Sequence, residues 1–303
     1  MDISLLEDFK ALAEYKNFSR AADSRGVTQP AFSRRIRTLE KWVGTELADR
    51  RTHRLELTAA GIRFLEVCED ISRRLHLGRQ EAIDAASSAS SLRFASTHAL
   101  SLTFFPSWLR RHEAAIASTT VRLIADSMHG CERTMMQGEA HFVLCHHHPA
   151  ALSRLDSDEF VSCVLGEDVL IPISAPDENG RPRYSLPGSA DNPLPYLGFN
   201  EESGMGRILA AAWARQPQQI WLKPVFASHL AIVLKQFARE GRGITWSPKS
   251  LVETELANGS VALGGGPEWQ VPMEIRLFRP RSRQMERVEE LWSQASDAAA
   301  VSM

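Results

Sequence analysis

The sequence predicts a chain of two parts, a small helical N-terminal domain followed by a larger α/β domain. Its 303 residues are enough for about two domains, and 44% of them are apolar, so the chain can bury real cores. The charge is unevenly divided, with twelve Lys or Arg against nine Asp or Glu in residues 1–63 and 23 against 28 in the remainder. Strand-like and helical runs alternate over residues 92–297, as is typical of α/β domains. These observations exclude a fibrous or disordered protein.

The first sixty residues predict three helices in a helix-turn-helix arrangement. Apolar residues recur at helical spacing over residues 2–16, which predicts the first helix. We expect Ser19 to cap a second helix that Gly26 ends. Thr28 is predicted to cap the third helix, with Pro30 near its start, where a missing N–H costs nothing.

The predicted third helix has one apolar and one basic side. Phe32, Ile36, Leu39 and Val43 form the apolar stripe, and the opposite side carries arginines. A helix of this kind fits the major groove of DNA, and residues 50–57 predict two short strands around a basic tip, a wing that can contact phosphate. A solvated basic face is the alternative. We expect DNA contacts from Ser19, Thr28, Gln29, Pro30, Ser33, Arg34, Arg37, Arg50, Arg51 and Arg54, with Gln29 and Ser33 reading bases and the arginines supplying charge-dependent affinity.

The same residues resemble one protein family. The runs at 18–22, 27–40, 44–47 and 57–61 follow the patterns S-x-x-A-A, S/T-Q-P-A-x-S-x-x-I-x-x-L-E, G-x-x-L-F and L-T-x-x-G, with Ala48 in place of the usual Phe. This order of motifs is similar to the DNA-binding domain of LysR-type transcriptional regulators. The resemblance implies an all-α winged helix-turn-helix domain (1–58), a linker helix (59–87) and an effector-binding α/β domain of periplasmic-binding-protein type (88–303). It implies two subdomains in the last part, about 92–164 with 264–297, and about 165–263.

A long helix is predicted after Thr58, a suitable N-cap, because no proline occurs before Pro106. Its apolar and small residues recur at spacings of four and three, which indicates a helix-pairing seam and hence a dimer or tetramer. An ordinary amphipathic helix packed on its own domain is the alternative. The small, polar run 85–91 is expected to be a hinge. The seam consists of Phe64, Cys68, Ile71, Leu75, Gly78, Ala82 and Ala85.

Three polar segments at predicted helix starts, 96–101, 200–207 and 228–229, are candidates for an effector cleft. Helix N-termini carry free N–H groups and bind anions or polar ligands, although plain capping would need the same residues. The candidate effector-binding residues are Ser96, Thr97, His98, Ser101, Ser203, Met205, Arg207, Ser228 and His229.

Runs at 97–102, 105–107, 203–207, 234–236 and 243–248 look like the hypochlorite-responsive branch of the LysR regulators. That resemblance implies a stress response in which methionine oxidation reports reactive chlorine, with Met205 at a matching position. At the other methionine positions of that branch this chain has His112 and Leu230. A small ligand bound in the cleft remains the alternative to an oxidant.

The cysteines and histidines predict no metal centre, and they leave one cysteine open as a redox site. Cys145 and Cys163 lie in apolar runs and are expected to be inert core residues, whereas Cys131 has charged neighbours and stays open as a peroxide-sensing thiol. On a strand, adjacent histidines point to opposite faces, so at most two of His146, His147 and His148 could share a metal ion. We expect them instead to form a solvated loop after a strand. No metal and no cofactor are predicted.

Catalysis is not predicted, because the sequence contains no GxSxG, Walker, HExxH or strand-following GxGxxG motif. An enzyme acting on a small polar substrate, with His98 and Ser101 as its only suitable pair, is the rival reading. The absence of a signal-like start and of a long apolar run leads us to expect a cytoplasmic protein without a membrane partner, and four unpatterned cysteines fit that compartment. The expected partners are double-stranded DNA, a small-molecule effector or oxidant, and further copies of the chain.

Overall fold

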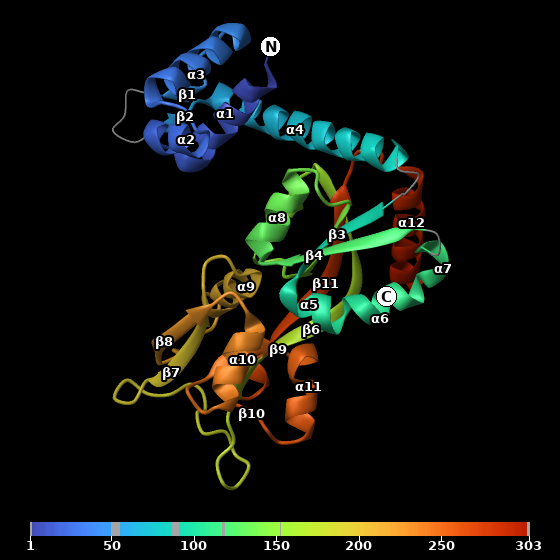
Figure 1. Cartoon of the computed structure of the whole chain (residues 1–303). Helices are drawn as coiled ribbons and strands as arrows, with labels where there is room; N and C mark the ends of the chain where they lie inside the picture. Colours follow the sequence, from blue (N-terminus) through green and yellow to red (C-terminus); the bar gives the residue numbers. More distant parts are fainter. Residues whose placement is uncertain (1, 50–54, 87–90, 117–118, 152, 302–303) are drawn as a thin grey trace. The chain divides into compact units, whose positions relative to one another are not determined.

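A computed structural model describes the whole chain except residues 1, 50–54, 87–90, 117–118, 152 and 302–303. The chain divides into two compact units, one of residues 1–87 with Met136–Glu139 and one of residues 88–135 with 140–303 (Figure 1). Each unit has its own apolar core. No helix within the described ranges is long and apolar enough to cross a membrane.

The N-terminal unit contains three short helices, a two-stranded wing and one long helix (Figure 1). The wing strands pair antiparallel, and the predicted wing tip lies outside the described residues. The elements are α1 (Ile3–Tyr15), α2 (Phe18–Ser24), α3 (Gln29–Val43), β1 (Ala48–Asp49), β2 (Glu56–Leu57) and α4 (Ala59–Ala86).

Local capping explains where these helices begin and end. Thr58 Oγ1 accepts a hydrogen bond from Gly61 N at 3.0 Å and starts α4, as expected. The expected cap of α2 was wrong: Asn17 Oδ1, rather than Ser19, accepts from the N–H groups at the start of that helix. The amide oxygen of Asn17, directly before the helix, reaches both Ser19 N and Arg20 N. Gly44 ends α3 with a φ of 89°, a left-handed conformation that favours glycine.

The apolar stripe predicted for α3 forms the core of the N-terminal unit. Phe32, Ile36 and Leu39 are fully buried against α1, and Val43 packs at the edge of the same core. Only part of the predicted seam of α4 is available for pairing with another helix, because Cys68 is buried in this core and Phe64 packs against it. Ile71 and Leu75 are exposed further along the helix. The helix continues to Ala86, so the predicted hinge at 85–91 starts within a helix and ends at the first residue of a strand; residues 87–90 lie outside the described part.

The C-terminal unit is an α/β domain of two lobes joined by two long strands. Its large sheet has the order β10-β6-β11-β5-β3-β4, with β9 also paired to β6, and its small sheet is the parallel pair β7-β8. The strands are β3 (Ser91–Thr97), β4 (Thr120–Asp126), β5 (Phe142–His147), β6 (Phe160–Ser174), β7 (Leu194–Phe199), β8 (Leu222–Ser228), β9 (Thr245–Pro248), β10 (Ala262–Leu263) and β11 (Val271–Pro280).

Helices cover both lobes of this unit. Figure 1 places α8 on one side of the large sheet and α6, α7 and α12 on the other. The helices are α5 (His98–Thr103), α6 (Phe105–Arg111), α7 (Glu113–Ile116), α8 (Met128–Met136), α9 (Gly204–Trp213), α10 (Ala231–Arg239), α11 (Lys249–Ala257) and α12 (Glu286–Val301), with short 3₁₀ turns at Arg154–Asp156 and Pro267–Trp269.

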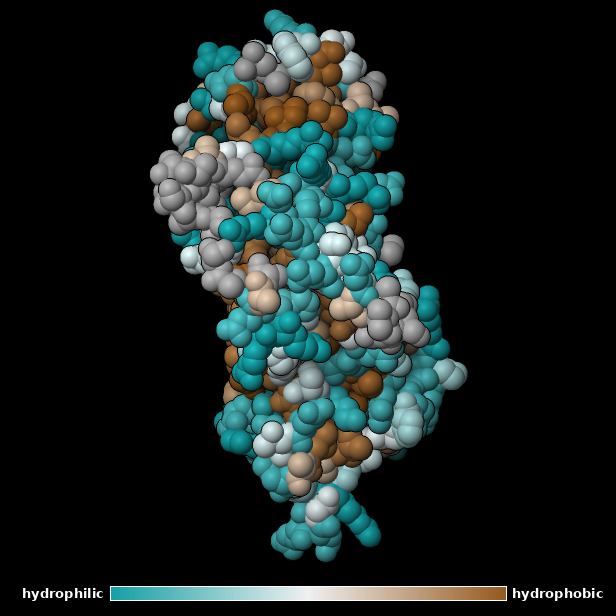
Figure 2. Space-filling view, turned by 90° about the vertical axis from the view of Figure 1, so that its right-hand side faces the viewer, coloured by the Kyte–Doolittle hydropathy of each residue, from teal (hydrophilic) through white to brown (hydrophobic). Residues whose placement is uncertain are grey.

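The strands β6 and β11 run from one lobe into the other. The first half of β6 pairs with β11 beside β5, and its second half pairs with β9 and β10. The first lobe is therefore built on β3, β4 and β5, and the second on β7 to β10 with α9, α10 and α11. This is the two-subdomain, periplasmic-binding-protein type of α/β domain that the sequence predicts. In the space-filling view, hydrophobic side chains reach the surface in patches among hydrophilic ones (Figure 2).

Candidate functional site

A small cavity of about 30 Å³ lies where three parallel strands end and four helices begin. The strands β3, β4 and β5 end at Thr97, Asp126 and His147, and β4 and β5 both pair parallel with β3. Carboxyl ends of parallel strands meet at one edge of a sheet, and ligands of open α/β folds bind there. The cavity has room for roughly two water molecules. It is lined by Thr97, His98, Ala99, Asp126, Ser127, Met128, His146, Ser203, Gly204, Met205, His229 and Ala231.

Five of the nine predicted effector residues line this cavity, and four do not. The five are Thr97, His98, Ser203, Met205 and His229. Ser101 Oγ instead donates to the His98 carbonyl at 2.8 Å, and Ser228 Oγ accepts from Leu230 N at 3.1 Å. Ser96 is fully buried in β3, where its hydroxyl donates to a backbone carbonyl. A nucleophilic serine would donate to the imidazole of a histidine, whereas the hydroxyl of Ser101 donates to the backbone carbonyl of His98.

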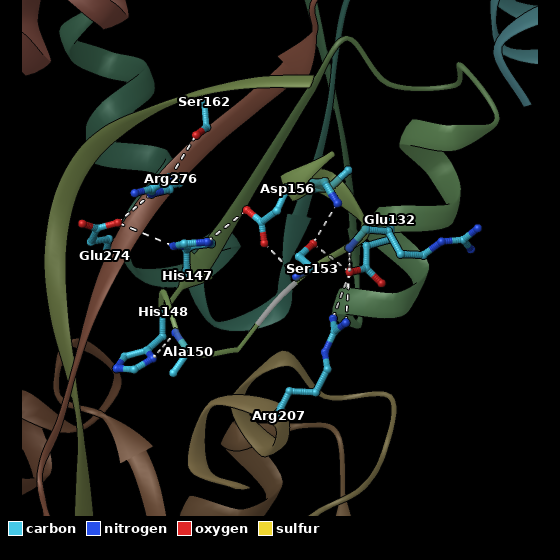
Figure 3. A network of polar contacts seen from close by, with 12 residues as sticks. Glu132, His147, His148, Ala150, Ser153, Asp156, Ser162, Arg207, Glu274 and Arg276 are labelled. Carbon is cyan, nitrogen blue, oxygen red and sulfur yellow. Dashed lines mark hydrogen bonds and ion pairs between the residues drawn. The ribbon is translucent and has the colours of Figure 1, made fainter. Parts of the chain in front are cut away.

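Arg207, the fourth predicted effector residue that does not line the cavity, forms an ion pair with a buried carboxylate. Both of its terminal nitrogens lie 3.1 Å from Oε1 of Glu132, whose side chain is 2% exposed. Ser153 Oγ and Arg154 N donate to the same oxygen (Figure 3). Glu132 belongs to α8 and Arg207 to α9, so this ion pair joins the first lobe to the second.

Two histidines face each other at the cavity. The rings of His98 and His229 have centroids 5.7 Å apart, and Nδ1 of His229 lies 3.6 Å from Glu202 Oε2. Burial, followed by the charge of His229, lowers the pKa of His98. His98 is therefore neutral near pH 7 and available as a hydrogen-bonding group rather than a fixed cation.

The histidine run at 146–148 is the clearest correction to the sequence analysis. His146 and His147 are buried in β5 instead of forming a solvated loop, and only His148 follows the strand. Each buried ring meets a carboxylate that is distant in sequence: His146 Nε2 lies 3.0 Å from Asp168, and His147 Nε2 lies 3.1 Å from Asp156 (Figure 3 shows the latter). Local composition does not reveal these partners, which is why the prediction failed.

Sequence reasoning missed four polar or sulfur-bearing residues of the cavity wall: Asp126, Ser127, Met128 and His146. Asp126 lies at the end of β4 and His146 at the end of β5, within the part of the chain where the sequence predicts alternating strands and helices. The rule that carboxyl ends of parallel strands meet at one edge would have pointed to them.

The cysteines offer no reactive thiol. Burial raises the pKa of Cys68 and Cys131 to about 12 and that of Cys163 to about 11, and it raises the pKa of Cys145 as well. Thiolates are the reactive form, so these four groups are poorly suited to peroxide sensing. Within the described residues, no group of three or more His, Cys, Asp or Glu could hold a metal ion.

The candidate DNA interface lies on the side of α3 that faces away from the core. Gln29, Arg34 and Arg37 are exposed there, and Ser33 is half-buried. The other predicted contacts that the structure describes, Ser19, Thr28 and Pro30, are also exposed; Arg50, Arg51 and Arg54 lie outside the described residues.

Two arginines of the basic segment have a structural partner instead. Asp8 is fully buried, and its two oxygens lie 2.8 Å from Arg25 Nε and 3.3 Å from Arg35 Nη1. This arrangement joins α1 to both helices of the helix-turn-helix. It leaves Arg34, Arg37 and Lys41 as the cations on α3 without an ion pair among the described residues.

Comparisons with known proteins agree with this geometry. The family described as "Bacterial regulatory helix-turn-helix protein, lysR family" matches residues 3–62, and "LysR substrate binding domain" matches residues 85–300. The transcriptional regulator YjiE of Escherichia coli is 28% identical over 297 residues, which cover 98% of this chain and 94% of that protein.

Two full-length solved structures are similar as well. HypT of Salmonella typhimurium, a hypochlorite-specific LysR-type regulator, is 27% identical with a TM-score of 0.61, and the match covers 99% of both chains. DarR of Vibrio fischeri, solved in complex with DNA, is 28% identical with a TM-score of 0.59, covering 98% of this chain and 99% of that one.

A helix-turn-helix unit followed by a two-lobed ligand-binding domain defines a class of one-component transcriptional regulators. The chain belongs to the LysR family of these regulators. It is accordingly a DNA-binding transcriptional regulator with an effector-binding domain, and not an enzyme.

Proposed function

We propose that this regulator reads double-stranded DNA with the exposed side of α3 and with the wing, and that the cavity of the C-terminal unit receives the signal. The observation that carries the proposal is the exposed basic side of α3, where Gln29, Arg34 and Arg37 stand free while neighbouring Arg25 and Arg35 are held by Asp8. Gln29 can pair with adenine, and an arginine can pair with guanine or phosphate.

Replacing Arg34 by Ala is expected to weaken DNA binding similarly for all sequences and to reduce the salt slope by about one, because one phosphate contact is lost. The measurement is binding to the regulator's own upstream DNA and to random duplex across a salt series. Arg242→Ala, which removes an exposed charge from the C-terminal unit, is the control. An unchanged slope would remove Arg34 from the phosphate contacts.

The linker helix α4 is proposed to pair with its counterpart in a homo-oligomer. Ile71 and Leu75 are exposed on it, as a pairing helix requires. Two copies would place two recognition helices about one DNA turn apart on a palindromic site. The proposed place of action is the cytoplasm, where the DNA is found.

The signal is proposed to be a small effector or an oxidant such as hypochlorite, acting at the cavity wall. Met205 is 8% exposed and Met128 is 4% exposed, and both line the cavity. Their helices approach closely, since a Cβ on Gly204 would lie 3.0 Å from Cβ of Met128. Oxidation of either thioether would place a polar sulfoxide in this contact and disturb the packing of α8 against α9.

We expect hypochlorite to change DNA binding of the wild type and to leave Met205→Ile unaffected. The measurement is operator binding before and after treatment, with oxidation at each methionine followed by mass spectrometry. Met128→Ile tests whether the second cavity methionine shares the role. A response that persists when both methionines are replaced in one variant would exclude oxidation at this wall, and a ligand screen on the cavity would then be the next step.

A further inference from the structure

We infer that the cavity is built to take a small ligand carrying an O–H or N–H group, which donates a hydrogen bond to Nδ1 of His146, and that Asp168 and Ser250 are positioning residues for this imidazole. The inference rests on the proposed role of the cavity as the effector site, and it adds the chemical class of the ligand and the atom that selects it.

The orientation of the His146 ring is fixed by a buried carboxylate. Nε2 of His146 lies 3.0 Å from Oδ2 of Asp168, and each side chain is only 3% exposed. A carboxylate can only accept, so Nε2 carries the hydrogen and donates it. In the neutral ring, Nδ1 is then a bare lone pair.

Asp168 is well suited to hold this tautomer because its own hydrogen bonds keep it ionised. Ser250 Oγ donates to Oδ2 at 2.6 Å, and Ser250 N and Val169 N donate to Oδ1 at 3.2 Å and 2.8 Å. Burial alone would raise the pKa of Asp168, but the hydrogen bond from His146, the positive charge of that ring when it is protonated, and the bonds from Ser250 and Val169 together lower it below its ordinary value. The Asp168 carboxylate is therefore ionised near pH 7 and acts only as an acceptor for the Nε2 hydrogen.

Nδ1 of His146 is a buried acceptor without a hydrogen-bond partner among the described residues, although His146 lines the cavity. Oγ1 of Thr97, at the same wall, is also buried and without a partner in that part of the chain. Buried polar atoms left unpaired are rare and costly, so a ligand that satisfies them gains affinity.

The other titratable groups around the cavity favour a donor as well. Asp126 adds a second acceptor, and the lowered pKa of His98 makes it neutral, while His229 faces Glu202. The small volume admits a ligand, or a ligand group, of only a few non-hydrogen atoms.

The hydrogen-bonded series also connects the two lobes. His146 lies on β5, Asp168 on the crossing strand β6, and Ser250 in the first turn of α11 in the second lobe. A ligand bound to Nδ1 thus contacts the second lobe through two hydrogen bonds, which gives it a route to bias the relative positions of the lobes.

The tautomer can be tested on the full-length protein by ¹⁵N NMR of its histidine rings, with His146→Phe assigning the signals. We expect Nε2 of His146 to be protonated and Nδ1 to be bare near pH 7. In Asp168→Asn the new amide can donate to Nε2, so the hydrogen should move to Nδ1, as a purely structural role of Asp168 would not require.

Ligand class is tested with ammonium against potassium, two ions of similar size of which only ammonium donates hydrogen bonds. We expect ammonium, at equal ionic strength, to shift the Nδ1 resonance and raise the melting temperature of the wild type, while potassium does neither. The ammonium effect should be lost in His146→Phe and in Asp168→Asn and kept in His148→Phe, because His148 lies outside the cavity wall.

Two results would overturn the inference. The first is protonation of both ring nitrogens of His146 near pH 7, which would make the cavity an anion site. The second is an ammonium effect that survives in Asp168→Asn or is matched by potassium. Neither result depends on DNA, so failure here is distinct from failure of the proposed regulator to recognise its operator.

Discussion

Replacing Gly61 by Ala is expected to destabilise the N-terminal unit by about 3 kcal/mol or more and to abolish DNA binding. A Cβ at this position of α4 would lie 2.0 Å from the carbonyl oxygen of Leu47. A shift of this carbonyl away from the new Cβ would break hydrogen bonds, since the carbonyl accepts from Thr58 N and the Leu47 N–H donates to Glu40. Leu47 itself is fully buried.

The matched control for Gly61 is Gly78→Ala in the same helix. Nothing lies within 4 Å of a Cβ at Gly78, so Ala should stabilise the helix there by about 0.5–1 kcal/mol. Thermal and urea unfolding of both variants, together with operator binding, gives the comparison. Equal stabilities of the two variants would show that the backbone of Leu47 yields at little cost.

Gly61 also illustrates what the sequence could reveal about the fold. It is the glycine of the L-T-x-x-G motif on which the family resemblance partly rests. The structure supplies its physical reason, the close approach of α4 to Leu47, which directly precedes the first wing strand β1. The helices and the α/β alternation were predictable because apolar periodicity is a local property. The cap of α2 was not, since Asn17 and Ser19 are both good N-caps and only geometry decides between them.

The cavity was less predictable because it is assembled from segments that are distant in the sequence. Thr97, Ser203 and His229 were found by the rule that ligands bind at helix starts. Arg207 obeyed the same rule and was wrong as a cavity residue, because a buried Glu132 some 75 positions earlier binds it. His146 was missed because the residue that holds it at the cavity wall, Asp168, lies 22 residues away in the sequence. Pairings of this kind are properties of the tertiary structure.

Replacing Arg207 by Met is expected to destabilise the C-terminal unit by about 3 kcal/mol. The substitution keeps most of the apolar stem but leaves the Glu132 carboxylate, 2% exposed, without a cation. Ser153 Oγ and Arg154 N still donate to it, which keeps the loss below that of a fully unpaired buried charge. For a unit of this size the melting temperature should fall by roughly 6–12 °C.

Arg133→Met is the control, because Arg133 is on the same helix as Glu132 but forms only a long, exposed ion pair. Its side chain is 59% exposed, and its Nη2 atom lies 3.9 Å from Oδ2 of Asp126. An exposed pair of that length contributes little, so its loss should change the melting temperature by about 1 °C or less. Since Glu132 and Arg207 belong to different lobes, the variant should also make the C-terminal unit more susceptible to limited proteolysis, with cleavage followed by mass spectrometry. If Arg207→Met has the melting temperature and the proteolysis pattern of Arg133→Met, the buried ion pair contributes nothing to holding the two lobes together. A ligand in the cavity would then have to bias the positions of the lobes through His146, Asp168 and Ser250 alone.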